Sequence, residues 1–245
     1  MVRFVFLIIA TLILNEAAAK SVVNVAAAAN VRDAMDRIKV LYEGENSDVT
    51  INVTYGASGV LVQQIMNGAN FSIFFSADEE YAERLKTDGF GEGDVVPYAT
   101  GKLALYSRSM DVSTEGLKAL YMANVRRISV ANPAVATYGT RAVEMLKDQG
   151  IYEQIKSKLI FGANISVAAQ YVLSGNAEVG FVALSQIKSP KAEVGGYTYI
   201  IPQGYYNPII QSCVLIKGAS VEAVKFRDFT LTEGCKAIWR EFGYE

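Results

Sequence analysis

The pattern of apolar and polar positions alternates between two spacings along the chain. Short runs rich in Val, Ile, Ala and Phe are each followed by a stretch in which apolar residues recur every three or four positions. The first such unit is the run 22–27, followed by Val31, Ala34, Met35, Ile38 and Leu41. The short runs are typical of strands and the longer spacing of amphipathic helices. Further strands are predicted at 49–55, 71–75, 102–107, 127–131, 158–161, 179–184, 197–201 and 212–216.

This alternation predicts an α/β protein with mostly parallel sheets, because a helix between two strands returns the chain to the same edge of the sheet. The run 179–184 is almost continuously apolar, which indicates a strand buried on both faces, as in a parallel sheet. In open sheets of this kind, ligands bind outside the carboxyl ends of the strands. The residues that follow the predicted strands are therefore the candidates for a site.

Four of these strand-to-helix junctions carry small or polar residues. They lie at Asn30, at Ser58, at Tyr138 with Gly139, and at Ile165 with Ser166. The first N–H groups of a helix have no partner within the helix, and its start carries roughly half a positive elementary charge, so it attracts anions. One such junction alone is more typical of an ordinary cap. Four together favour a shared site for a small oxyanion.

Ser58 lies in the turn Gly-Ala-Ser-Gly and allows two other interpretations. It is compatible with a helix N-cap. It is also compatible with a nucleophile on a strand-to-helix turn, although Val60 stands where the Gly-x-Ser-x-Gly elbow has its last glycine. The chain has no His, which excludes a Ser-His-Asp relay and leaves only a Ser-Lys pair open.

Composition narrows the classes of ligand. The formal net charge is −2 without a long run of Lys or Arg, which argues against a nucleic-acid partner. With no His, only two Cys and no Cys-x-x-Cys, a site for a transition-metal cation is not expected. Cys213 and Cys235 are compatible either with a disulfide or with buried free thiols.

The first nineteen residues have the pattern of a secretory signal peptide. Arg3 precedes the apolar run 4–14, and Ala17, Ala18 and Ala19 provide small residues for cleavage near Ala19. About eleven apolar residues are too few for a span that needs about twenty. We therefore expect a mature protein that is soluble and exported to the periplasm.

Several motifs in fixed order resemble one known family. They are VNVAAAANVRDAM, TYGASGVLVQQIMNGANFSIFFSADEEYAERL, SVANPAVATYGTRAVEML, GANISVAAQYVLSGNAEVGFVALSQI, YNPIIQSCVLIK and REFGY. In these motifs the sequence is similar to the periplasmic molybdate-binding proteins of ABC importers, a type II periplasmic binding protein family. The resemblance extends over nearly the whole mature chain.

The resemblance implies a two-lobed binding protein without a cofactor, each lobe a mostly parallel sheet flanked by helices. Lobe one would comprise residues 20–99 and 205–245, lobe two residues 100–204, and molybdate or tungstate would bind in the cleft between them. Asn30 and Ser58 would contribute from lobe one, and the amides of Tyr138 and Ile165 from lobe two. The molybdenum or tungsten would be held as an oxyanion, not as a metal cation. A membrane permease would be the partner, and a monomer is the expectation for this fold.

Two positions depart from one branch of the family. Asn30 stands where a Ser often supplies a hydroxyl, and Ala183 stands where some members have a Tyr that reaches the ligand. Whether Tyr138 replaces that donor with its phenol, or offers only its amide, is open from the sequence. The alternatives for function are a binding protein for sulfate, phosphate or another small anion, and a secreted hydrolase with Ser58 as nucleophile and a Lys base.

Overall fold

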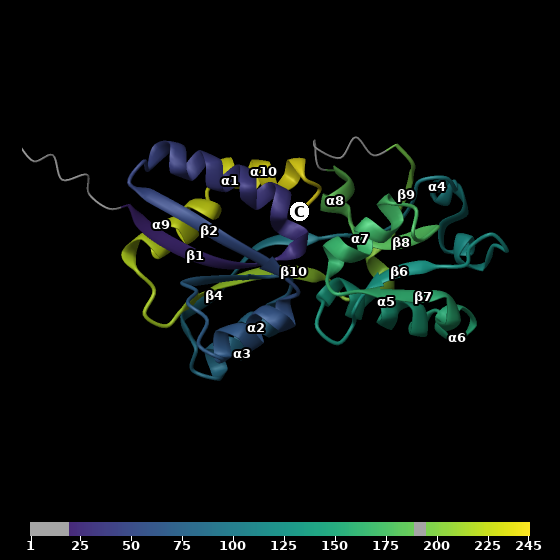
Figure 1. Cartoon of the computed structure of the whole chain (residues 1–245), viewed down its shortest axis with the longest axis horizontal. Helices are drawn as coiled ribbons and strands as arrows, with labels where there is room; N and C mark the ends of the chain where they lie inside the picture. The colour runs from purple at the N-terminus through teal and green to yellow at the C-terminus, as the bar shows by residue number, and fades with distance from the viewer. Residues whose placement is uncertain (1–19, 189–194) are drawn as a thin grey trace, which may run out of the picture.

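Two five-stranded sheets organise the described part of the chain, which comprises residues 20–188 and 195–245 of a computed structural model. Figure 1 shows the sheets at opposite ends of the long axis, each with helices packed against it. We call the half built on the first sheet lobe one and the half built on the second sheet lobe two. The predicted signal peptide, residues 1–19, lies outside the described residues.

The sheet of lobe one has the strand order β2-β1-β3-β10-β4. Its strands are β1 (Ser21–Ala28), β2 (Val49–Gly56), β3 (Ile73–Ser76), β4 (Gly91–Gly101) and β10 (Ile209–Ile216). β1 pairs in parallel with β2 and β3, whereas β10 is antiparallel to both of its neighbours, β3 and β4. Four of the five strands therefore share one direction, and only β10 runs against them.

The sheet of lobe two repeats this arrangement with the order β7-β6-β8-β5-β9. Its strands are β5 (Leu103–Ser107), β6 (Ile128–Ala131), β7 (Leu159–Gly162), β8 (Val179–Ala183) and β9 (Tyr197–Ile200). β6 pairs in parallel with β7 and β8, and β5 is antiparallel to β8 and β9. The prediction of two mostly parallel sheets is thus confirmed.

Helices cover both faces of the first sheet. They are α1 (Arg32–Glu45), α2 (Ser58–Met66), α3 (Glu79–Thr87), α9 (Val221–Thr230) and α10 (Glu233–Glu241), with a 3-10 turn η1 (Ala29–Val31) before α1. One core joins α1, α9 and α10 to the sheet through Met35, Phe226 and Trp239, and another joins α2 and α3 to the other face through Leu61 and Leu85. Cys213 and Cys235 are both buried in the first of these cores as free thiols.

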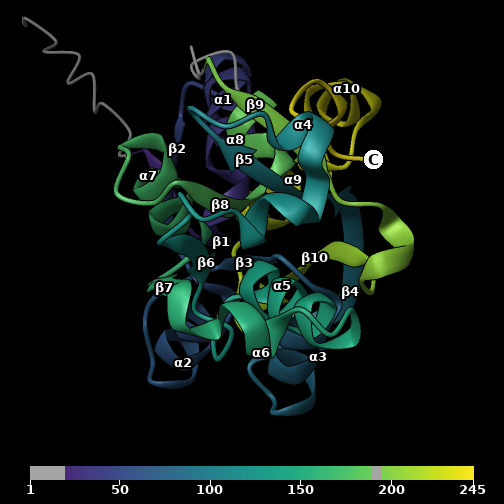
Figure 2. The same ribbon diagram turned by 90° about the vertical axis from the view of Figure 1, so that its right-hand side faces the viewer.

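Lobe two also has helices around its sheet, three of them very short. They are α4 (Val112–Glu115), α5 (Thr137–Asp148), α6 (Tyr152–Ile155), α7 (Ile165–Leu173) and α8 (Leu184–Lys188), with 3-10 turns η2 (Gly116–Tyr121), η3 (Lys156–Lys158) and η4 (Gln203–Tyr205). In the view along the long axis, α5 and α7 lie on different sides of β6 and β8 (Figure 2). None of the helices within the described residues is long and apolar enough to cross a membrane.

One strand of lobe one was missing from the sequence-based prediction. β4 contains Gly91, Gly93 and Pro97, residue types that are depleted in strands. Pro97 is tolerated in β4 because this strand lies at the edge of the sheet, where a proline does not interrupt a central ladder of hydrogen bonds. β4 continues through Gly101 towards β5, so it is one of the two connections between the sheets, and the segment that leads from β9 into β10 is the other.

Candidate functional site

The four junction residues predicted from the sequence line one small pocket between the lobes. Asn30 lies in η1 after β1, Ser58 opens α2 after β2, Tyr138 is the second residue of α5 after β6, and Ile165 opens α7 after β7. All four are at most 4% exposed. The other lining residues are Ala28, Ala29, Gly56, Ala57, Ala77, Ala136 and Thr137. The fold therefore brings the four junctions together, while their role in binding stays a prediction.

Among the described residues, none that lines this pocket has a charged side chain. Arg84 and Arg141 line a neighbouring hollow that shares Thr137 with the pocket. There is also no Lys in the lining, so within the described residues Ser58 has no candidate base beside it in the pocket. Groups of three or more His, Cys, Asp or Glu that could hold a metal ion do not occur in residues 20–188 and 195–245. What the pocket offers is hydroxyl and main-chain N–H donors.

The helices that open at the pocket leave amide groups free for a ligand. α2 and α5 begin after Ala57 and Ala136, which have no side chain that caps a helix. In α7, Oδ1 of Asn164 accepts from the amides of Ser166 at 2.9 Å and Val167 at 3.1 Å. The amide of Ile165 is the first of its helix and has no acceptor in the preceding turn. α7 thus has a capping residue, as α9 and α10 have in Ser220 and Thr232, whereas α2 and α5 have none.

Ser58 is not a helix cap. It is the first residue of α2, and no side chain caps that helix. Its Oγ instead accepts a hydrogen bond from the main-chain N–H of Ala77 at 3.1 Å. A hydroxyl that accepts in this way keeps its own proton to donate. The N-cap interpretation is therefore wrong, and the side chain of Ser58 is set up as a donor at the pocket.

The side chain of Asn30 is held by residues behind the pocket. Its Nδ2 donates to Oε1 of Gln211 and to Oη of Tyr244, both at 2.9 Å. Its main-chain carbonyl accepts from Oη of Tyr244 at 2.8 Å and from Oγ of Ser185 in lobe two at 2.9 Å. Since both protons of the side-chain amide have partners, the donor left to Asn30 at the pocket is its main-chain N–H, while its buried Oδ1 has no hydrogen-bond partner among the described residues.

The phenol of Tyr138 is buried and accepts a hydrogen bond from Nε2 of Gln211 at 3.3 Å. Burial is the main reason why the pKa of Tyr138 is raised well above its usual value, and the nearby Tyr244 and Tyr206 add to the shift. The hydroxyl therefore stays protonated and neutral at physiological pH. It lies among groups of both lobes, since Gln211 is on β10.

Direct contacts join the two lobes around the pocket. Oγ of Ser166 donates to the carbonyl of Ala29 at 3.1 Å, and the amide of Gly59 donates to the carbonyl of Val135 at 2.9 Å. Together with the Ser185 contact to Asn30, these bonds close the rim of the pocket from both sides.

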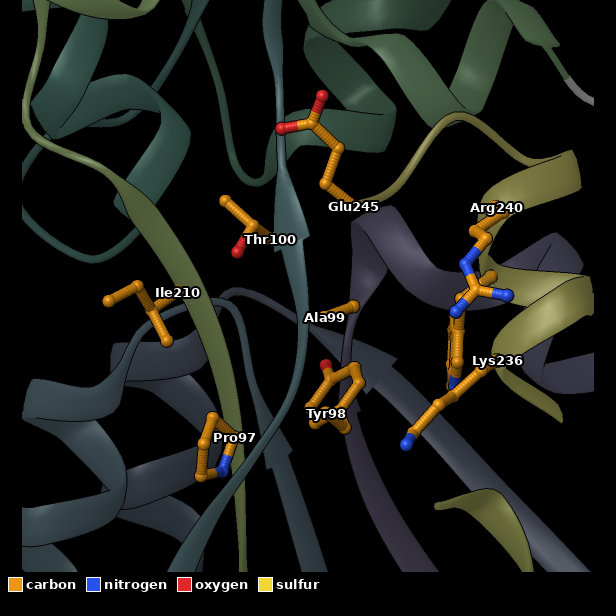
Figure 3. A pocket seen from close by; sticks show the side chains of 9 residues that line it. Pro97, Tyr98, Ala99, Thr100, Ile210, Lys236, Arg240 and Glu245 are labelled. Atoms are coloured by element: carbon orange, nitrogen blue, oxygen red, sulfur yellow. The ribbon is translucent and has the colours of Figure 1, made fainter. Parts of the chain in front are cut away.

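A second hollow lies beside the strands that connect the lobes (Figure 3). Glu245 pairs there with Thr100 through two main-chain hydrogen bonds, at 2.6 and 3.0 Å. The side-chain carboxylate of Glu245 lies 2.5 Å from Nζ of Lys102. Lys236 and Arg240 of α10 border the same hollow. The end of the chain is therefore anchored where the first connection enters lobe two.

Comparison with known proteins identifies the family. A family model described as bacterial extracellular solute-binding protein matches residues 23–245. The chain belongs to this family. It is 35% identical over 230 residues to a protein of Rhodobacter capsulatus named molybdate-binding protein ModA (93% of this chain, 89% of that protein). It is 38% identical over 231 residues to the protein of the same name from Azotobacter vinelandii (93% and 91%).

The fold of these solute-binding proteins is shared as well. The solved structure of the Azotobacter vinelandii periplasmic molybdate-binding protein superimposes with a TM-score of 0.86 at 29% identity, covering 91% of this chain and 98% of that one. Membership in a family of solute-binding proteins agrees with the expectation of a binding protein and not with the alternative of a hydrolase. It also confirms the resemblance drawn from the sequence motifs.

Sequence reasoning missed the residues that support the pocket from behind or from its rim. Gln211, Tyr244, Ser185 and Thr137 were not among the candidates. Gln211 carried a signal, because it is a large polar residue among the mostly apolar residues of the last strand, β10. For Tyr244, nothing in its position three residues after Glu241 indicated that it contacts Asn30.

Proposed function

We propose that this protein captures molybdate, and also tungstate, outside the cytoplasm and delivers it to the membrane permease of an ABC importer. The observation that carries the proposal is the convergence of Asn30, Ser58, Tyr138 and Ile165 in one pocket without charged lining residues. The names of the relatives from Rhodobacter capsulatus and Azotobacter vinelandii support molybdate as the ligand.

Uncharged donors are sufficient to bind such a dianion. A hydrogen bond to a charged group contributes roughly 1.5 to 3 kcal/mol, so about six donors offset the loss of hydration and leave micromolar or tighter affinity. In our proposal five of these donors are the hydroxyl of Ser58 and the main-chain amides of Asn30, Ser58, Tyr138 and Ile165, with a contribution from the helix starts themselves.

The same donors discriminate among anions. Hydrogen phosphate carries a proton that needs an acceptor, and leaving it unpaired costs about 1 to 3 kcal/mol. Sulfate has no such proton, but it is smaller than molybdate and leaves some donors out of reach. Molybdate and tungstate have nearly the same size and charge, so we expect both to bind.

Binding is coupled to the approach of the lobes. We propose residues 20–99 and 205–245 as lobe one and residues 100–204 as lobe two, with the two connections between the sheets as the hinge. This division is supported by the strand content of the two sheets. Because Asn30 and Ser58 belong to lobe one and Tyr138 and Ile165 to lobe two, one ligand that contacts all four stabilises the closed arrangement.

The cellular setting follows from the same proposal. A family of extracellular solute-binding proteins and the predicted cleavage near Ala19 support an exported, periplasmic protein. The mature chain acts as a monomer that docks on its permease after it has closed around the ligand.

Calorimetric titration of the mature protein with molybdate, tungstate, sulfate and phosphate tests the proposal. We expect micromolar or tighter dissociation constants for molybdate and tungstate, and much weaker binding of sulfate and phosphate. Heats for sulfate comparable to those for molybdate would overturn the selectivity, and the absence of binding by any of the four would overturn the function.

A further inference from the structure

Gln211 is a buried amide that contacts both halves of the pocket from behind. It lies on β10 with none of its surface exposed. Its Oε1 accepts from Nδ2 of Asn30 at 2.9 Å and from Oη of Tyr98 at 3.3 Å, and its Nε2 donates to Oη of Tyr138 at 3.3 Å. Burying an amide is unfavourable unless it is hydrogen-bonded, and this amide is bonded at both ends.

The backbone leaves room for the contact between Gln211 and Tyr138. A Cβ atom on Gly101 would lie 2.1 Å from Oη of Tyr138 and 2.7 Å from Nε2 of Gln211, closer than real contacts allow. Gly101 is on β4 and pairs with Ile209 at the start of β10. A glycine at this point of the first connection is therefore required for the phenol and the amide to meet.

The hydrogen bonds around Gln211 have a defined direction. Asn30 donates to Oε1, and Tyr98 shares its single proton between Oε1 at 3.3 Å and the carbonyl of Ser76 at 3.0 Å. The donation from Asn30 fixes the carbonyl side of the amide towards lobe one and directs Nε2 to Tyr138. An NH₂ group only donates, so the phenol oxygen of Tyr138 has to accept. Its own proton then remains to be donated: the described residues show no hydrogen bond from it, and the buried Oδ1 of Asn30, whose side chain lies within reach of the phenol, also has no partner.

We propose that Gln211 is a positioning residue that makes the hydroxyl of Tyr138 a dedicated donor to the bound oxyanion, an inference that rests on the proposed function. The chain of hydrogen bonds runs from Asn30 through Gln211 to Tyr138 and on to the ligand, and each bond in such a chain strengthens the next. With its lone pair occupied by Gln211, Tyr138 offers a proton but no acceptor. Gln211 thereby contributes to the preference for fully ionised oxyanions over those that carry a proton.

A double-mutant cycle on the mature protein tests this role. Dissociation constants for molybdate and for hydrogen phosphate are measured by titration calorimetry for the wild type, Gln211→Met, Tyr138→Phe and the double variant. Gln211→Met keeps the length of the side chain but removes both ends of the hydrogen-bond chain. We expect each single variant to weaken molybdate binding about tenfold, the double variant to be no weaker than either, and phosphate binding to change much less.

Tyr98→Phe is the matched control. It removes the shared hydrogen bond to Oε1 of Gln211 and to the carbonyl of Ser76 but leaves the bond between Gln211 and Tyr138, so we expect the molybdate constant to stay within about threefold of the wild type. Losses that multiply in the double variant, or equal losses for molybdate and phosphate, would overturn the inference. If Gln211→Met does not fold, Tyr138→Phe decides alone, because an unchanged molybdate constant contradicts the donor role.

Failure of the inference can be told apart from failure of the proposed function. If the wild type binds molybdate and the cycle shows no coupling, only the role of Gln211 is refuted. If the wild type binds another oxyanion instead, the function is refuted, and the same cycle measured with that anion still tests Gln211.

Discussion

The carboxylate of Asp78 in lobe one accepts a hydrogen bond from the hydroxyl of Thr137 in lobe two. Both residues are buried, and Thr137 lines the pocket. The other carboxylate oxygen of Asp78 caps α3 by accepting from the amide of Tyr81 at 2.9 Å. A side chain that caps a helix in one lobe thus also holds the rim of the pocket in the other.

Thr137→Val is expected to weaken molybdate binding about tenfold by removing this link. A hydrogen bond to a charged group contributes about 1.5 to 3 kcal/mol, and here that stabilisation belongs only to the closed arrangement. Titration calorimetry gives the affinity, and small-angle scattering gives the compaction on adding ligand. Thr140→Val is the control, because Oγ1 of Thr140 bonds only carbonyls of its own lobe, those of Pro133 and Ala136. Equal losses in the two variants would contradict the role of the link.

Ser58→Ala is expected to raise the dissociation constant for molybdate tenfold or more, about 1.4 kcal/mol, with the fold intact. The variant loses the one side-chain hydroxyl that opens α2 at the pocket. Ser129→Ala is a suitable comparison, since Ser129 is also buried and its Oγ bonds a main-chain carbonyl, that of Ala168 at 2.8 Å. We expect it to lower thermal stability without changing affinity. An unchanged constant for Ser58→Ala would leave the hydroxyl without a role in binding.

Gly59→Ala and Gly44→Ala form a matched pair of helix substitutions. A Cβ at Gly59 would lie 2.7 Å from Oη of Tyr81 and 3.1 Å from the carbonyl of Val135 in lobe two, whereas one at Gly44 meets nothing within 4 Å. Alanine favours a helix over glycine by up to about 1 kcal/mol in its interior and by less near its ends, and both glycines lie next to an end of their helix. We expect Gly44→Ala to raise the melting temperature without affecting binding, and Gly59→Ala to weaken molybdate binding by hindering closure. The same affinity in both variants would show that this contact tolerates a methyl group.

Stability is expected to fall at alkaline pH because of buried acidic groups. Burial raises the pKa of the Cys213 thiol from 9.0 to about 12. The folded state keeps this thiol neutral while the unfolded chain ionises, so the stabilisation is fully present below pH 9.0 and is lost as the pH rises towards about 12. Urea unfolding between about pH 8 and pH 11 should show a free energy of unfolding that decreases by up to about 1.4 kcal/mol per pH unit from this group.

Cys213→Ala provides the control for this pH dependence. The variant lacks the thiol, so its stability should fall less steeply over the same range, although Tyr98 and Tyr138, whose pKa values are also raised by burial, still contribute. Identical slopes for the variant and the wild type would contradict the assignment to Cys213.

The local pattern of apolar and polar positions was enough to predict most of the strands and helices and the four junction residues. Each predicted strand is present, with ends shifted by at most three residues, because a strand buried on both faces requires a continuous apolar run. β4 was missed because Gly91, Gly93 and Pro97 hide a strand that is stabilised only by its pairing with β10. The sequence did not decide whether Cys213 and Cys235 form a disulfide, because a disulfide depends on the distance between the two residues in space, which their spacing along the chain does not give.

The sequence by itself determined that strands and helices alternate, that Asn30, Ser58, Tyr138 and Ile165 begin helices, and that the chain resembles a family of oxyanion-binding proteins. These properties depend on neighbours along the chain. Only the tertiary structure decided that Ser58 accepts from Ala77, that Asn30 turns its side chain to Gln211 and Tyr244, and that Asp78 reaches Thr137. Those contacts join residues up to 214 positions apart, and a buried polar group takes whichever partner the packing of the lobes brings within reach.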